Sequence, residues 1–247
     1  GRMYEYNGKK FYILPDNWKD AAYRHGFRQE YNVNISGGDS KISYYSSIGY
    51  LKEKGVLENS GYERFTARLK ADYQATDWLH LLANASYVHA DRESNPNLSN
   101  TNSNASNLGY FTQYISPIYP IYVRTIDANG NPVIATDRFG HPQYDFGVPA
   151  TNFQGLNGRP FSQTGNPLGS NRYNKVNDIL DQLQGQLNFD ITFTPWLKFN
   201  STNSITLILS RFSHYENPFI GNAAATNGSI DKYTDVSYRW NYVQTLN

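Results

Sequence analysis

Several residues and patterns that would indicate a common class of protein are missing from this sequence. Cysteine is absent, which excludes disulfides and thiolate metal sites. No stretch approaches the ~18 consecutive apolar residues of a transmembrane helix. Charged residues make up only 17% of the chain, and the net charge of +1 provides no basic field for nucleic acid. The sequence therefore predicts no nucleic-acid partner.

Signatures of catalysis and of cofactor binding are missing too. The five histidines lack the H-E-x-x-H spacing of a zinc site, and the P-loop, Rossmann and G-x-S-x-G patterns do not occur. Asp178 and Asp181 lie three residues apart, so in a strand they point to opposite faces and cannot act as a carboxylate pair. The sequence predicts a protein that is not an enzyme and that has no cofactor and no metal site.

One stretch keeps a calcium site open as an alternative. Residues 127–131 (Asp-Ala-Asn-Gly-Asn) resemble the beginning of a calcium loop with oxygen ligands. Arg138 stands where an EF-hand has its bidentate glutamate. A turn built on aspartate and glycine is therefore the favoured interpretation of this stretch.

The chain is rich in tyrosine, with 21 residues, and in Asn, Ser, Thr, Gln and Gly. This mixture disfavours helices and suits strands that are joined by turns. Apolar and polar residues alternate along about seven long segments, as in Phe65–Tyr73. These segments match or exceed the ~9–11 residues that a tilted strand needs to cross a bilayer. The sequence predicts an all-β protein with an antiparallel meander.

Two of the turns between these segments carry a tryptophan. They are the stretches Thr76–Leu81, with Trp78, and Thr194–Phe199, with Trp196. A tryptophan that enters a strand with one apolar face is typical of the aromatic girdle of an outer-membrane barrel. We therefore expect Trp78 and Trp196 to be anchors at the membrane interface.

The connections between the segments alternate strictly between shorter and longer. The shorter ones are 37–41, 75–78 and 194–196, and the longer ones are 52–61, about 93–175 and about 213–233. Outer-membrane barrels have short periplasmic turns and longer extracellular loops. A mean hydropathy of −0.64 is compatible with a barrel, because only alternate residues of a strand meet lipid. Seven strands cannot close a bacterial barrel, so residues 1–247 are expected to form part of a larger one.

Four charged residues fall on one face of a predicted strand. Arg64, Arg68, Lys70 and Asp72 alternate with the apolar series from Phe65 to Tyr73. Charge that faces lipid costs ~2–4 kcal/mol at the midplane of the membrane. We therefore expect these four side chains to line the lumen, where they contact a plug or the translocating solute.

Aromatic residues gather in the longest connection, among Asn, Ser, Gly and Pro. The candidates for ligand binding are Tyr110, Tyr114, Tyr119, Tyr122, Tyr144, Phe146 and Phe153. Aromatic faces with amide and hydroxyl neighbours can stack on sugar rings and bond their hydroxyl groups. The alternative is that these rings pack the loop onto itself or onto a partner protein.

Several motifs in a fixed order resemble one family. The stretches are Asn34–Gly55, Tyr62–Tyr73, Thr76–Leu79, Pro117–Tyr122 and Gly165–Leu168. Together they are similar to the SusC/RagA-type TonB-dependent transporters of the Bacteroidetes outer membrane. The resemblance covers most of the chain from about residue 27 onwards.

The resemblance implies a barrel of the 22-stranded class in the bacterial outer membrane, in contact with membrane lipid. It implies a plug inside the barrel that is pulled by the TonB complex, and a SusD-like lipoprotein lid outside the cell. The cargo of such transporters is an oligosaccharide or a peptide. The plug and the C-terminal strands of the family have no counterpart in residues 1–247.

Two other functions stay open at this point. A secreted all-β glycan-binding module would use the aromatic loops without a membrane, and it would be soluble and monomeric without detergent. A passive porin or adhesin barrel would lack energy coupling and a plug. The leading interpretation is a segment of a nutrient importer.

Overall fold

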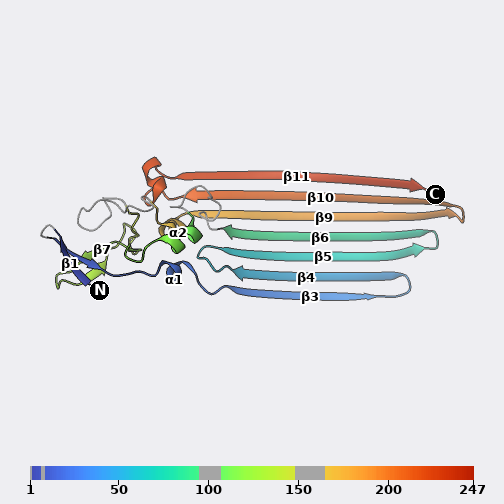
Figure 1. The fold of residues 1–247 in the computed structure, drawn as a ribbon. Coiled ribbons are helices and arrows are strands. Elements are labelled where there is room, and N and C mark those ends of the chain that lie inside the picture. The colour runs from blue at the N-terminus through green and yellow to red at the C-terminus, as the bar shows by residue number, and fades with distance from the viewer. Residues whose placement is uncertain (1, 7–8, 95–106, 148–164) are drawn as a thin grey trace.

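A seven-stranded antiparallel sheet dominates the computed structural model, which describes residues 2–6, 9–94, 107–147 and 165–247. Its strands are β3 (Phe27–Gly38), β4 (Ile42–Lys54), β5 (Gly61–Thr76), β6 (Leu79–Ser94), β9 (Lys175–Thr194), β10 (Leu197–Glu216) and β11 (Ser229–Leu246). Each strand pairs with the strands next to it in this order, so the sheet is a meander (Figure 1). The predicted all-β meander is confirmed.

The two ends of the sheet differ in the length of their connections. One end, which we call the turn end, carries 39–41, 77–78 and 195–196. The other, the loop end, carries 55–60, 95–174 and 217–228. The third of these is shorter than the predicted loop 213–233, because β10 and β11 extend their alternation further. At the turn end, the Asp39 carboxylate accepts hydrogen bonds from the backbone N–H of Lys41 (2.7 Å) and of Ile42 (3.0 Å).

Short elements gather at the loop end. They are β1 (Arg2–Tyr6), β2 (Lys9–Ile13), α1 (Trp18–Ala22), α2 (Leu108–Tyr114), β7 (Arg124–Ile126), β8 (Pro132–Ile134), α3 (Pro167–Tyr173) and the 3-10 helix η2 (Asn222–Thr226). The sequence predicted the long connection as a loop, whereas its described parts contain two helices and a hairpin. Among the described helices, none has the length and hydropathy to span a membrane.

A small hydrophobic core holds the loop end together. It consists of Trp18, Ala22, Leu108, Phe111, Ile115, Ile121 and Leu168. The rings of Trp18 and Phe111 are 4.8 Å apart, and Trp18 Nε1 donates to the carbonyl of Tyr119 (2.9 Å). We call these residues the cap core. They join the segment before β3 to the connection between β6 and β9.

An asparagine begins each of the three α-helices at the loop end. The side chains of Asn17, Asn107 and Asn166 each accept a hydrogen bond from the backbone three residues later, which satisfies a free N–H of the first turn. Asn166 is fully buried, and its Nδ2 donates to the carbonyls of Ile121 (3.0 Å) and Asp145 (2.9 Å). This amide therefore fixes helix α3 against two other parts of the connection.

Candidate functional site

The register of the sheet separates its residues into two faces of opposite character. Residues directly opposite each other on neighbouring strands share a face. One row contains Arg68, Ser86, Gln184, Thr206 and Arg239. The adjacent row, on the other face, contains Ala67, Tyr87, Leu183, Leu207 and Tyr238. We call these the polar face and the apolar face.

The four charged residues selected from the sequence lie on the polar face. Arg64, Arg68, Lys70 and Asp72 alternate along β5 with residues of the apolar face. Their partners across β6 are Ala90, Ser86, Asn84 and Leu82, in that order. That these side chains line a lumen stays a prediction.

A column of uncharged amides runs along the middle of the polar face. On β9 it consists of Gln182, Gln184, Gln186 and Asn188. Hydroxyl and amide side chains flank it on both sides, namely Asn84, Ser86, Thr202, Ser204 and Thr206. Gln186 Nε2 donates to Asn188 Oδ1 (3.1 Å), and the Ser86 hydroxyl donates to Gln184 Oε1 (3.4 Å). The column offers donors and acceptors without net charge.

Nearer the turn end, a histidine joins three strands of the polar face. His80 on β6 contacts Asp72 on β5 through Nε2 (2.8 Å) and Asp190 on β9 through Nδ1 (3.0 Å). Asn200 on β10 donates to the other oxygen of Asp190 (2.8 Å). Two ionised carboxylates would each accept a hydrogen bond from a ring N–H, so this geometry suits a ring that is protonated at both nitrogens. Of these residues, sequence reasoning selected only Asp72, because the contact of His80 with Asp190 depends on the register between β6 and β9.

A cavity of about 690 Å³ lies where the polar face meets the loop end. Its lining includes Leu57, Tyr62, Arg92, Asp178, Phe212 and His214. Arg92 and Asp178 form an ion pair at 2.6 Å, and Phe212 stacks on Tyr233 with ring centroids 5.6 Å apart. Aromatic walls with a few convergent polar groups are typical of ligand pockets. Sequence reasoning missed this cavity, because its walls come from segments far apart in the chain.

The aromatic candidates of the long connection divide into exposed and packed residues. The rings of Tyr110 and Tyr114 lie 4.4 Å apart on α2, and the side chain of Tyr114 is 63% exposed. Tyr119, Tyr122 and Tyr144 pack against the cap core. Burial, with the neighbouring Tyr122 hydroxyl, raises the pKa of the Tyr144 hydroxyl.

Phe146 and Phe153 differ from the other candidates. Phe146 is only 7% exposed, and a Cβ at Gly169 would lie 2.9 Å from its ring. Its position favours the packing role over ligand binding. Phe153 lies outside the described residues.

Both tryptophans of the sequence analysis lie in turns at the turn end of the sheet (Figure 1). Trp78 and Trp196 are 53% and 76% exposed, which is unusual for residues of this size. Both tryptophan side chains are therefore free to contact the surroundings of the protein. Their role as membrane anchors stays a prediction.

The calcium-like stretch forms a turn that occurs twice. In Asp127–Asn131 the carboxylate accepts the backbone N–H of Asn129 (2.9 Å) and Asn131 (2.8 Å). Asp137–His141 repeats these bonds, and the glycine at the fourth position has a positive φ in both turns. The Asn131 N–H is the main cause that lowers the pKa of Asp127. In the part of the chain that the structure describes, no three Asp, Glu, His or Cys residues gather as a metal site.

Comparison with known proteins begins with short matches in sequence. No family model matches the chain. TonB-dependent receptor P39 of Formosa agariphila is 36% identical over 61 residues, which are 25% of this chain and 6% of the receptor. TonB-dependent receptor SusC of Bacteroides thetaiotaomicron is 33% identical over 51 residues, or 21% of this chain and 5% of SusC.

The fold extends the similarity to nearly the whole chain. The RagAB peptide importer in its closed-closed state matches with a TM-score of 0.64 and 19% identity, over 97% of this chain and 24% of the matched one. The open-open state gives a TM-score of 0.61 over 94% of this chain. The chain therefore spans about a quarter of the length of that transporter chain. The predicted similarity is confirmed: the chain has the fold of part of the β-barrel of SusC/RagA-type TonB-dependent transporters.

Proposed function

We propose that this chain is part of the barrel wall of a TonB-dependent nutrient importer in a bacterial outer membrane. The observation that carries the proposal is the separation of the two faces along strands of up to 20 residues. The apolar face meets lipid, and the polar face lines the lumen. The relatives are named as receptors and importers, which supports transport and not catalysis.

The unequal connections support an orientation for this wall. The turn end faces the periplasm, with Trp78 and Trp196 as anchors at the inner interface. The loop end lies outside the cell, where the cap core, the half-buried Tyr110 and the exposed Tyr114 meet a SusD-like lipoprotein lid or the cargo. TonB acts on this wall through a plug inside the barrel.

The polar face supports a division of roles inside the lumen. Arg64, Arg68, Lys70 and Asp72 hold the plug through charge. The neutral amide column and the cavity near Arg92 and Phe212 contact the cargo. Uncharged donors and acceptors suit an oligosaccharide, which is rich in hydroxyl groups. RagAB is named as a peptide importer, so a peptide is the second candidate.

Uptake by cells that make the complete gene product tests the proposal. A strain without the gene is compared with a complemented strain, using fluorescent oligosaccharides and peptides. We expect uptake that needs the gene and stops when TonB is inactivated. Uptake that continues without TonB would establish a passive porin instead. If the chain itself were soluble and monomeric without detergent and unfolded sharply, the glycan-binding module would replace the barrel.

A further inference from the structure

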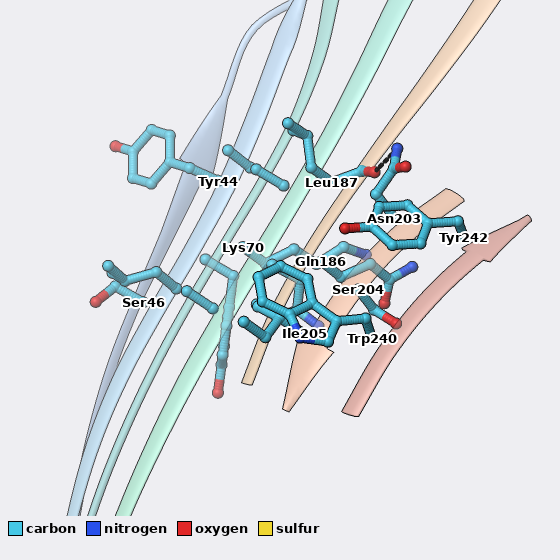
Figure 2. A pocket seen from close by; sticks show the side chains of 17 residues that line it. Tyr44, Ser46, Lys70, Gln186, Leu187, Asn203, Ser204, Ile205, Trp240 and Tyr242 are labelled. Carbon is cyan, nitrogen blue, oxygen red and sulfur yellow. Dashed lines mark hydrogen bonds between the residues drawn. The ribbon is translucent and has the colours of Figure 1, made fainter. Parts of the chain in front are cut away.

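The apolar face carries a groove near the middle of the strands, with a volume of about 690 Å³ (Figure 2). Four of its lining residues are small: Ala71 on β5, Ala83 and Ala85 on β6, and Gly185 on β9. They belong to two adjacent rows, because Ala71 is opposite Ala83, and Ala85 is opposite Gly185. The groove therefore exists because four neighbouring positions lack a large side chain.

Large side chains border this floor. They are Tyr44, Leu69, Leu187, Ile205, Trp240 and Tyr242. Figure 2 shows Trp240 and Tyr242 on the β11 side of the groove and Tyr44 on the opposite side. The rings of Trp240 and Tyr242 are nearly parallel, at 8°, with centroids 6.3 Å apart. Together these residues present flat and branched carbon surfaces to whatever fills the groove.

Two polar side chains of the apolar face, Ser46 and Asn203, lie among them, and the donors of Asn203 are used within the protein. Asn203 Nδ2 donates to the carbonyl of Leu187 (3.2 Å, dashed in Figure 2) and to the Ser201 hydroxyl oxygen (3.0 Å). A polar group that is already bonded costs little when hydrocarbon covers it. The surface of the groove is overwhelmingly carbon, so it suits an apolar occupant.

We propose that this groove holds an acyl chain of a membrane lipid. The inference rests on the proposed function, which places the apolar face against the membrane. The groove is continuous with that face, since its rows adjoin rows of Leu183, Leu207 and Phe189. A flexible hydrocarbon chain can follow a narrow floor of alanine and glycine and lie against the two stacked rings. Each CH₂ group that it buries adds to the affinity.

Filling the floor of the groove tests this directly. In Gly185→Leu, the new Cβ would have Ile205 Cγ2 as its nearest neighbour, at 3.4 Å, which is an ordinary contact. The leucine would then occupy the groove. Ala67→Leu is the matched control, because Ala67 shares the apolar face and does not line the groove. Ala85→Leu is a second filling variant in case Gly185→Leu does not fold.

The complete gene product is purified from membranes in mild detergent, and its bound lipid is counted by native mass spectrometry and lipid extraction. We expect the filling variants to lose one lipid per chain, and the control to keep the wild-type count. An unchanged count in both filling variants overturns the proposal. If the filling variants instead convert an oligomer to monomers without loss of lipid, the groove holds a second copy of this chain, and the lipid proposal is overturned. Absence of the protein from the membrane fraction would overturn the proposed function as well. Normal uptake by the filling variants with an unchanged lipid count would overturn only the proposal that the groove binds lipid.

Discussion

The two faces of the sheet belong to the same strands but are stabilised differently. On the polar face, charged and amide side chains bond across strands, as His80 does with Asp72 and Asp190. On the apolar face, the central rows contain mostly aliphatic and aromatic residues that are largely exposed, such as Leu69 and Tyr238. Several side chains of the polar face are bonded within the protein, whereas an apolar face of this kind needs a surrounding that covers it.

The apolar face also changes character along its length. Toward the loop end it carries ion pairs: Lys52 with Glu63 (3.0 Å), and Arg211 with Asp181. A strand of 20 residues is about 68 Å long at ~3.4 Å per residue, which exceeds the ~30 Å of hydrocarbon in a bilayer even when the strand tilts. In the proposed orientation, these ion pairs mark where the strands leave the hydrocarbon on the outer side.

The largest effect is expected from a charge placed on the apolar face. Leu187→Arg should lower the stability of the membrane-inserted protein by about 2–4 kcal/mol, the cost of arginine that faces lipid at the midplane, because Leu187 lies midway along β9 between Asp181 and the turn at 195–196. Gln186→Arg is the matched control on the polar face, one residue away, and should change this stability little. The measurement is the folded fraction of the complete gene product in outer membranes. Equal losses in both variants would contradict the assignment of the faces.

A smaller effect is expected from the histidine of the polar face. His80→Ala removes two bonds to carboxylates and leaves no ring between Asp72 and Asp190. We expect a loss of about 1–2 kcal/mol, below the full worth of charged hydrogen bonds because the groups are partly exposed. Urea unfolding in lipid vesicles measures it. His214→Ala serves as control, since its nitrogen lies 3.9 Å from Asp231; a loss as large there would argue against a special role of His80.

The tryptophans at the turn end should contribute less. Trp196→Ala should cost about 1 kcal/mol in lipid vesicles, because only part of the ring is covered at an interface. Thermal unfolding in vesicles measures the loss. Ile118→Ala removes an exposed apolar side chain at the loop end, where no membrane is expected, and should have little effect. A larger loss for Ile118 than for Trp196 would reverse the proposed orientation.

The smallest effect concerns pH at the turn end, away from both faces. The backbone N–H groups of Lys41 and then Ile42 lower the pKa of Asp39. The ionised carboxylate therefore stabilises the folded state above the unfolded pKa of ~3.9, and this contribution disappears as the pH falls through the lower folded value. Asp39→Ala should be less stable than wild type at pH 7 and equal to it once both are acidified. A difference that is constant with pH would rule out this contribution.

Local patterns explain which parts of this structure the sequence could predict. Alternation with a period of two residues gave the strands and both faces, including Arg64 to Asp72, because side-chain direction depends only on position along the strand. The contact of His80 with Asp190 depends on the pairing of β6 with β9, and so does the arrangement of the groove walls. About 80 residues of sequence separate these two strands. No local pattern reports such a pairing.

The loop end was harder to predict for a different reason. Its helices have only five to seven residues, too short to show a helical period. Phe146 and Tyr114 look alike in the sequence, yet one is buried beside Gly169 and the other is exposed on α2. Burial at such positions follows from tertiary packing. The asparagine caps could not be recognised from the sequence either, because the short helices that they begin were not predicted.

The cap core has a consequence for how this wall assembles. β3 to β6 and β9 to β11 are two sets of hairpins whose pairing is local, and β6 must find β9 across the long connection. Closing a flexible loop costs conformational entropy that grows with its length. Packing of α2 and α3 around Phe111 and Leu168 draws the two ends of that connection together. Once the cap core has formed, β6 and β9 can pair progressively from the loop end towards the turn end.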